Sequence, residues 1–187
     1  PLFFMKLSEV EFLRAEGALR GWNMGGSAQG FYVQGVENAY NETYLRDLDE
    51  NWDEIRFDED VYQNKVSTPA NRFTLDSYLD IDAAKSITYE DPSNASHNAE
   101  CLVTVGVKWN EGDDNETKLE KIITQKYIAG FPYSFGAWND LRRTGYPRIF
   151  PVLSRDRGDG SIVRGDIIRR IPFSASDEAS KADIAVS

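Results

Sequence analysis

The chain has 187 residues, of which 41% are hydrophobic and 12% aromatic, and this composition is typical of a folded globular protein. Its net charge of −10 argues against binding to nucleic acid or to an anionic lipid surface, since both need clustered lysine and arginine. No run of apolar residues reaches the roughly 20 that a membrane-spanning helix needs. The single cysteine, Cys101, excludes an internal disulfide bond and any site with several cysteine ligands.

Two helices are predicted at the start of the chain, where they form the helical pair 7–40. The first covers Leu7–Trp22, and the spacing of Ser8 and Glu11 predicts a capping box at its beginning. The apolar residues on one stripe of this helix are Phe12, Ala15, Leu19 and Trp22. After two glycines, the second helix is predicted at about Ser27–Tyr40. A pair of this length, with small and aromatic residues along its seam, is typical of a tetratricopeptide unit.

Residues 41–117 are predicted as an irregular insertion, in which the periodic pattern weakens from 41 to 71 and acidic residues become frequent. A short helix is expected at Leu75–Ala84, with Thr74 as its capping residue. Apolar residues alternate with others from 102 to 109, and this pattern predicts an extended segment from which Trp109 packs inward.

A helical hairpin is predicted at 118–146, and a loop-rich tail at 147–187. The apolar residues of its first helix, which recur near every 3.6 positions, are Leu119, Ile122, Ile123, Tyr127 and Phe131. Gly130 and the proline two residues later end that helix. The second helix begins at Ser134, which has a side chain suited to capping. One face of this second helix carries Phe135, Trp138 and Leu141.

The hairpin and the tail carry ordered strings that helical periodicity alone does not produce. These strings are ITQKYIAGFPYSFGAWNDLRRTGYPRIFP at 123–151 and RRIPF at 169–173. Both resemble the C-terminal half of the SusD/RagB family, whose members are outer-membrane lipoproteins through which Bacteroides-type bacteria capture nutrients. The resemblance covers about residues 1–40 and 102–173.

The resemblance implies a mainly α fold, in which tetratricopeptide-like helical hairpins carry a loop-rich insertion and little β structure. It also implies that the chain is the C-terminal portion of a longer protein, whose N-terminal part carries the lipid anchor to the outer membrane. We therefore expect residues 1–187 to form a single such portion, divided into the four segments given above.

The family binds oligosaccharides or other nutrients at the cell surface and delivers them to a SusC-type TonB-dependent transporter, without chemistry and without a cofactor. The resemblance implies the same function, location and partner for this chain. The alternative is a helical protein-interaction scaffold that packs on the transporter without contacting the ligand itself. An exposed aromatic cleft would favour glycan binding, whereas a broad apolar patch on the helices would favour the scaffold.

The residues themselves do not point to an enzyme. The only histidine, His97, lies in a polar loop, where we expect a solvated side chain. No nucleophile motif surrounds Cys101, and a lone cysteine usually behaves as a small buried apolar residue. With 31 acidic residues, chance pairs of carboxylates are certain, so their abundance does not indicate a glycosidase.

An acidic stretch in the insertion resembles the start of an EF-hand calcium loop, because acids and an amide alternate in the string DLDENWD at 47–53. The match fails at Trp52, where the sharp turn requires glycine, and at Asp58, where the loop requires a bidentate glutamate. We therefore predict no metal site and interpret this stretch as an acidic surface loop.

The insertion also supplies the best candidates for ligand contacts. Trp52 has polar and charged neighbours and lies on no helical stripe, so it is the candidate for an exposed platform on which a sugar ring stacks. Tyr44 and Tyr62 are predicted to flank it, and Asn51 to bond sugar hydroxyls. The alternative is that these aromatic side chains anchor an irregular loop to the helical layer.

Four residues of the hairpin that match the family strings are predicted to hold the fold together, namely Trp138, Arg142, Arg143 and Tyr146. Because Trp138 and Trp22 lie on apolar stripes, we expect both in the core. The two arginines are expected to pair with acids or backbone carbonyls and so hold the hairpin against residues 146–150. Binding of a ligand carboxylate is their alternative role.

Overall fold

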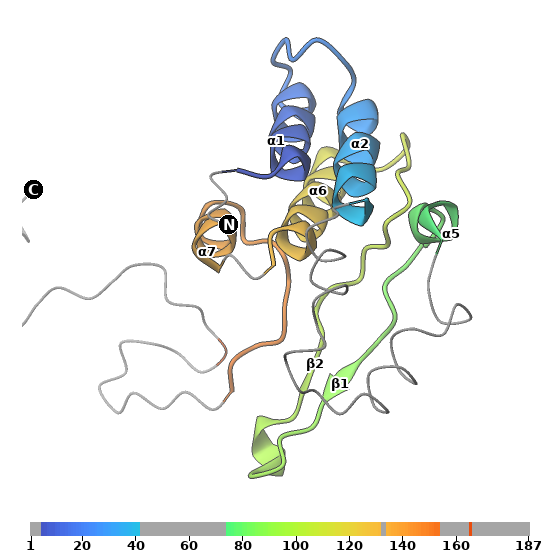
Figure 1. Ribbon diagram of the computed structural model, residues 1–187. Coiled ribbons are helices and arrows are strands. Elements are labelled where there is room, and N and C mark those ends of the chain that lie inside the picture. The colour runs from blue at the N-terminus through green and yellow to red at the C-terminus, as the bar shows by residue number, and fades with distance from the viewer. Residues whose placement is uncertain (1–4, 42–73, 132–133, 154–164, 166–187) are drawn as a thin grey trace, which may run out of the picture. The chain divides into compact units, whose positions relative to one another are not determined.

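The computed structural model describes residues 5–41, 74–131, 134–153 and 165 of the chain (Figure 1). Its elements, in chain order, are α1 (Leu7–Leu19), α2 (Ala28–Tyr40), α5 (Leu75–Leu79), β1 (Thr88–Tyr89), the 3-10 helix η3 (Ala95–His97), β2 (Ala99–Glu100), α6 (Asn115–Ala129) and α7 (Ser134–Thr144). Within these described residues, helix far exceeds strand, so the predicted mainly α fold class is confirmed. None of the described helices is both long and apolar enough to cross a membrane.

The chain divides into two compact units. One comprises Pro1–Ser86 and Leu102–Ile149, and the other comprises Ile87–Cys101 and Phe150–Ser187. In the first unit, α1 and α2 lie side by side and α6 packs against both (Figure 1). In the second, β1 and β2 pair antiparallel, with η3 between them in the chain.

The first helix begins without the predicted capping box. Its N-cap is Lys6, no side chain caps the helix, and Ser8 is a buried helical residue. Glu11 does not reach back to the helix start but accepts hydrogen bonds from Arg14 at 3.1 Å. A tertiary contact fixes this end instead, because the Lys6 ammonium donates to the carbonyl of Ala129, at the C-terminus of α6, at 2.9 Å.

The first helix also ends before Trp22, and the expectation that Trp22 lies in the core is wrong. The Gly21 N–H bonds the Ala18 carbonyl, and the Trp22 N–H bonds the Gly17 carbonyl, at 3.0 and 2.9 Å. With Gly21 at φ 83°, these two bonds form a Schellman motif that closes the helix. Trp22 therefore leaves the helical stripe, and 66% of its surface is exposed.

The second helix is confirmed within one residue of its prediction. The Ser27 side chain caps it by accepting from the Gly30 N–H at 3.1 Å. Gly35 lets α2 approach α1 closely, since a Cβ at this position would lie 2.8 Å from the Phe12 ring. That ring is 1% exposed and enclosed by the core.

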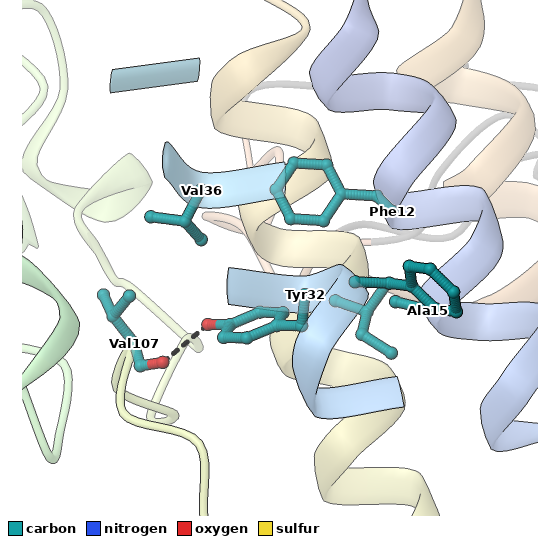
Figure 2. Close-up of a cluster of buried hydrophobic side chains, with 7 residues drawn as sticks. Phe12, Ala15, Tyr32, Val36 and Val107 are labelled. Carbon is teal, nitrogen blue, oxygen red and sulfur yellow. Dashed lines mark hydrogen bonds between the residues drawn. The ribbon is translucent and has the colours of Figure 1, made fainter. Parts of the chain in front are cut away.

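The core of the first unit is centred on Tyr32 of α2 (Figure 2). Its buried residues are Phe12, Ala15, Phe31, Tyr32, Val36, Val107 and Ile122. Tyr32 is fully buried, and its hydroxyl donates to the Val107 carbonyl at 2.6 Å. Burial raises the pKa of Tyr32 far above its ordinary value, so the hydroxyl stays a donor. This bond joins α2 to the extended segment 102–109.

The short helix α5 has the predicted cap but ends earlier than predicted. The Thr74 hydroxyl accepts from the Ser77 N–H at 3.2 Å. The predicted extension to Ala84 is wrong, because the backbone after Asp80 pairs with the extended segment. The Ile81 carbonyl accepts from the N–H groups of both Val107 and Lys108 at 2.8 Å. In the extended segment, Val107 is buried and Lys108 exposed, as the alternating pattern predicted.

The hairpin helices are less buried at their junction than predicted. The first, α6, starts at Asn115, three residues before the prediction, because Asp114 caps it by accepting from the Thr117 N–H at 2.7 Å. Leu119, Ile122 and Ile123 are buried as predicted. The prediction that the buried stripe continues to Tyr127 and Phe131 is wrong, since these side chains are 42% and 77% exposed. Phe135, at the start of α7, is also exposed.

A buried carboxylate on α6 faces the chain that follows α7. Glu120 is 3% exposed, and its Oε2 lies 3.2 Å from the Arg148 guanidinium. Its other oxygen, Oε1, is buried without a hydrogen-bond partner, as is the hydroxyl of Thr124 one turn later. Burial raises the pKa of Glu120, and the charge of Arg148 only partly offsets this effect.

The contact between Gly35 and Phe12 predicts that Gly35→Ala destabilises the protein. The added methyl group overpacks a ring that has no room to move, which typically costs about 1–3 kcal/mol of unfolding free energy. Gly136→Ala, in α7, is the matched control, because a Cβ there meets no atom within 4 Å. It should raise stability by up to about 1 kcal/mol through helix propensity. Equal effects of both variants in denaturant unfolding would contradict the close approach.

The burial of Glu120 predicts a pH-dependent effect of Glu120→Gln. A raised folded-state pKa gives stability that is present below the ordinary glutamate pKa and is lost as pH rises through the folded-state value. The unfolding free energy of Glu120→Gln minus that of the native protein should therefore increase as the pH rises from acid to neutral. Urea unfolding at a series of pH values measures this difference, and a difference that is constant with pH would refute the raised pKa.

Candidate functional site

One hollow of the first unit is an open groove of about 650 Å³ beside Trp109. Its walls come from α2, from α5 and from the end of the extended segment, and α2 and α5 are in contact. The lining residues are Gln29, Tyr32, Val33, Thr74, Asp76, Ser77, Leu79, Asp80, Lys108 and Trp109. The position of α5 is fixed from the other side, because the Tyr78 hydroxyl donates to the Gln125 amide oxygen of α6 at 2.8 Å.

Trp109 is held in place by contacts with its surroundings. Its ring packs at a tilt against Tyr32, with 5.0 Å between the ring centroids. Its indole N–H donates to Glu111 Oε1 at 3.1 Å, and the Lys118 ammonium lies 5.8 Å from the ring centroid. The indole is partly buried, and it also lines the groove. It therefore offers a preorganised aromatic surface, which binds at low entropic cost.

The polar side chains of the groove include one ion pair. Lys108 Nζ lies 2.7 Å from Asp80 Oδ1, and both side chains are largely exposed. The hydrogen bond and the charge of Lys108 hold the pKa of Asp80 below its usual value, and Asp80 raises that of Lys108 in turn. Gln29 supplies a neutral amide, which both donates and accepts. The hydroxyls of Thr74 and Ser77 donate to the Ser77 hydroxyl and to the Thr74 carbonyl, so toward a ligand they supply acceptors.

The lining of the groove suits the binding of a ligand. An aromatic surface with a few polar groups around it is typical of a ligand site. Neither histidine nor cysteine is present among the lining residues that the structure describes, and their carboxylates are those of Asp76 and Asp80. Across the described part of the chain, no group of three histidine, cysteine or acidic side chains is placed to hold a metal ion.

The predicted ligand residues lie outside the described residues. Tyr44, Asn51, Trp52 and Tyr62 all belong to the stretch 42–73, as does the acidic stretch 47–53. Their role therefore stays a prediction. The described chain resumes at Thr74, which lines the groove, so this stretch joins the groove directly in sequence.

The sequence predicts the inward packing of Trp109 but not the groove around it. The alternation of residues 102–109 predicted that Trp109 packs inward, which the contact with Tyr32 confirms. Gln29, Asp76, Asp80 and Lys108 gave no signal, because they meet only through the pairing of Ile81 with the extended segment. A polar residue on each of three separate elements is unremarkable until the fold joins them.

A second cavity, of about 210 Å³, lies where α1 begins and α6 and α7 meet. Its two lysines are engaged with neighbouring helices. Lys6 donates to the Ala129 carbonyl at 2.9 Å, and Lys126 pairs with Asp140 at 2.9 Å. Most of its wall is formed by small side chains and Tyr127, so it offers less polar recognition than the groove.

The two adjacent arginines of the hairpin have different environments. Arg143 bonds both oxygens of Glu16 in α1, with 2.9 Å between Nη2 and Oε2, and also bonds Asp140 at 2.8 Å. Burial raises the pKa of Glu16, but the hydrogen bonds from Arg143 and Arg20 more than offset this and hold it below its usual value. Arg142 instead lies over the Trp138 ring, 4.7 Å from its centroid.

The aromatic residues of the same motif divide between surface and core. Trp138 is only partly buried, so its expected place in the core is wrong; its ring packs 6.0 Å from that of exposed Phe135. Tyr146 is buried against Leu119 and Ile123 of α6. Its hydroxyl donates to Glu116 Oε2 at 3.2 Å. The segment after α7 is thus fixed on α6.

The histidine of the second unit is less solvated than predicted. His97 Nδ1 lies 3.2 Å from Asp91 Oδ2, with 24% of the histidine side chain exposed. Hydrogen bonds from the Ser93 hydroxyl and N–H hold the pKa of Asp91 low, at about 2. These contacts close a loop between β1 and β2. Cys101 is only partly buried, against the expectation of a buried apolar role.

A protein-family model described as SusD-like, SusD and RagB outer membrane lipoprotein, matches residues 1–72 and 50–186 of the chain. These ranges include both strings on which the resemblance was based. Among curated proteins, no sequence matches.

Solved structures of SusD homologues resemble the chain over nearly all of its length. A chitin-binding SusD homologue from Flavobacterium johnsoniae is 35% identical, with a TM-score of 0.71 over 99% of this chain and 33% of that one. A homologue from Bacteroides thetaiotaomicron is 33% identical, with a TM-score of 0.69 over 100% and 33%. One from Bacteroides ovatus is 31% identical, with a TM-score of 0.66 over 94% and 31%. The chain therefore spans about a third of the length of these relatives.

The contact with Glu16 predicts that Arg143→Met is destabilising, by about 1–3 kcal/mol of unfolding free energy, because it removes a fork of charged hydrogen bonds from a buried carboxylate. Arg142→Met, at the neighbouring position, should cost less than about 1 kcal/mol, since it loses only a contact with an aromatic ring. The pair contributes stability above the ordinary glutamate pKa and loses it as pH falls through the lower folded-state value. Thermal unfolding should therefore show the Arg143 effect shrinking in acid; equal losses from both variants would contradict this assignment.

Proposed function

The chain belongs to the SusD/RagB family of outer-membrane lipoproteins, and from this premise we propose that the protein binds an oligosaccharide or other nutrient at the cell surface and delivers it to a SusC-type TonB-dependent transporter. The observation that carries the proposal is the groove beside Trp109, which offers an aromatic ring together with neutral and charged polar groups. Its role is capture of the ligand, not chemistry.

A glycan suits this groove for physical reasons. The C–H faces of a sugar ring are apolar and stack on an indole, whereas its hydroxyls need hydrogen-bonding partners. Trp109 supplies the ring, and Gln29, Thr74 and Ser77 supply the partners. The similar protein from Flavobacterium johnsoniae binds chitin, so a chitin-type oligosaccharide is the first ligand to test.

The residues predicted from sequence extend the proposal. The stretch that ends at Thr74, on the groove, carries Trp52, Tyr44, Tyr62 and Asn51. We propose that Trp52 is a second stacking platform for the same ligand, with the two tyrosines beside it. Because the family is one of outer membrane lipoproteins, we propose that the protein is lipid-anchored at the surface of the outer membrane.

The second candidate function is a helical scaffold that packs on the transporter without contacting the ligand. Exposed apolar side chains around the junction of α6 and α7 favour it, since such side chains mark interaction surfaces. They are Tyr127, Ile128, Phe131 and Phe135, with exposed fractions of 42%, 52%, 77% and 74%. Serine substitutions at Phe131 and Phe135 should weaken copurification with the transporter and leave glycan binding unchanged if both functions coexist.

Trp109 gives the sharpest test of glycan binding. In calorimetric titration of the intact protein with chitin oligosaccharides, Trp109→Leu should weaken binding by about three- to tenfold, since it removes the stacking face but keeps apolar bulk. Trp109→Phe, which keeps an aromatic ring, should lose less. Thermal unfolding of both variants checks that the changed contact with Tyr32 does not unfold the protein.

Trp22→Leu is the matched control, because this tryptophan is exposed and lies outside the groove. Native affinity in Trp109→Leu would move the site away from the groove, and Trp52→Leu would then test the predicted platform. The absence of binding to every glycan in a panel would overturn the glycan proposal and leave a peptide or other nutrient ligand, or the scaffold.

A further inference from the structure

We infer that the groove beside Trp109 selects glycans by charge: it takes neutral or amine-bearing oligosaccharides and disfavours those with carboxylate or sulfate groups, and Asp76 is the residue that sets this preference. The inference rests on the proposed function, because it names the class of glycan that the same groove takes. It adds a specificity-determining residue that the family resemblance does not supply.

The charges on the groove wall do not balance. Asp76, Asp80 and Lys108 are the charged side chains among its lining residues, so two carboxylates face one ammonium. Lys108 lies 2.7 Å from Asp80, and the two charges neutralise each other. Within the described part of the chain, no side chain pairs with the Asp76 carboxylate, which is exposed. One negative charge therefore remains for an incoming ligand.

An anionic sugar is disfavoured twice by this arrangement. Its carboxylate or sulfate would approach Asp76, and the cation that could compensate is already paired with Asp80. At longer range it meets a protein with a net charge of −10, although salt screens this contribution beyond a Debye length of about 8 Å at physiological ionic strength. A neutral sugar meets neither penalty, and an ammonium group gains an attractive partner in Asp76.

The remaining polar groups suit an uncharged ligand. Gln29 supplies an amide that donates and accepts, and the Thr74 and Ser77 hydroxyls, whose protons are bonded within the turn, supply acceptors. All three suit the hydroxyl or acetamido groups of an uncharged sugar. The groove therefore needs no ionised group on the ligand for recognition. Discrimination comes from repulsion of the wrong ligand as much as from attraction of the right one.

The experiment is a charge ladder in the intact protein. The three charged lining residues give the native groove a net charge of −1. Lys108→Met changes this charge to −2, and Asp76→Asn and Asp80→Asn each change it to 0. The double variant, with both aspartates replaced, has a charge of +1. Calorimetric titration compares three oligosaccharides of equal length: an N-acetylated chitin oligosaccharide, its deacetylated chitosan counterpart and an oligogalacturonate. Each unit of positive charge added to the lining should reduce the ratio of chitin to galacturonate affinity by about two- to tenfold. Added salt should make the differences between the variants smaller.

Glu37→Gln is the matched control, since it removes one negative charge from an exposed position on α2 outside the groove. It should leave the preference unchanged. Chitosan binding should fall in Asp76→Asn and not in Glu37→Gln. A preference that is constant along the ladder, with chitin binding intact, would overturn the charge selection and leave the proposed function standing. Failure of all three oligosaccharides to bind the native protein would overturn this inference, and the wider glycan panel would then decide the proposed function.

Discussion

The hydrogen bond from the Tyr32 hydroxyl to the Val107 carbonyl determines how the first unit is assembled. Tyr32 is fully buried, and a buried hydroxyl without a partner would cost about 1–3 kcal/mol, so the extended segment has to lie where its carbonyl meets α2. Residues 75 positions apart in the chain are thereby held together. Because side chains alternate along an extended segment, Trp109 falls on the same side as Val107 and packs on the Tyr32 ring.

The groove follows from the same constraint. With Val107 fixed, its N–H and that of Lys108 both bond the Ile81 carbonyl, which places Asp80 beside the Lys108 ammonium. This pairing also ends α5 early, because the backbone after Asp80 bonds the extended segment instead of continuing the helix. A single buried donor on α2 thus accounts for the position of the aromatic ring, for the ion pair and for the second wall of the groove.

The parts of the fold that periodicity predicts are the ones that local chemistry determines. Ser27 and Thr74 cap their helices as predicted, since a cap needs only the backbone N–H groups that follow it. The start of α1 was not predictable in this way, because Lys6 is held by the distant end of α6. Trp22 has the spacing of a core residue, yet the left-handed Gly21 ends the helix before it, and spacing alone carries no information on that turn.

The sequence predicts the inward packing of Trp109 but not its place on the wall of a groove, and the reason is physical. Inward packing of Trp109 is a property of one alternating segment and is visible in the sequence. The groove is formed by α2, α5 and the extended segment together, and their packing depends on the hydrogen bond from Tyr32 to Val107. The platform predicted at Trp52 belongs to a stretch whose acids and aromatics follow no period, so sequence gives its composition but no geometry.

The two kinds of ion pair in the first unit serve different ends. The pair of Arg143 with Glu16 involves a carboxylate that is 6% exposed, and such a group is strongly destabilising when it loses its partner, so this pair fixes α7 on α1. Lys108 and Asp80 are largely exposed, and an exposed pair contributes only about 0–1 kcal/mol. The ion pair of Lys108 with Asp80 therefore contributes little to the stability of the fold. Their effect is on the potential of the groove, where pairing leaves Asp76 as the charge that a ligand meets.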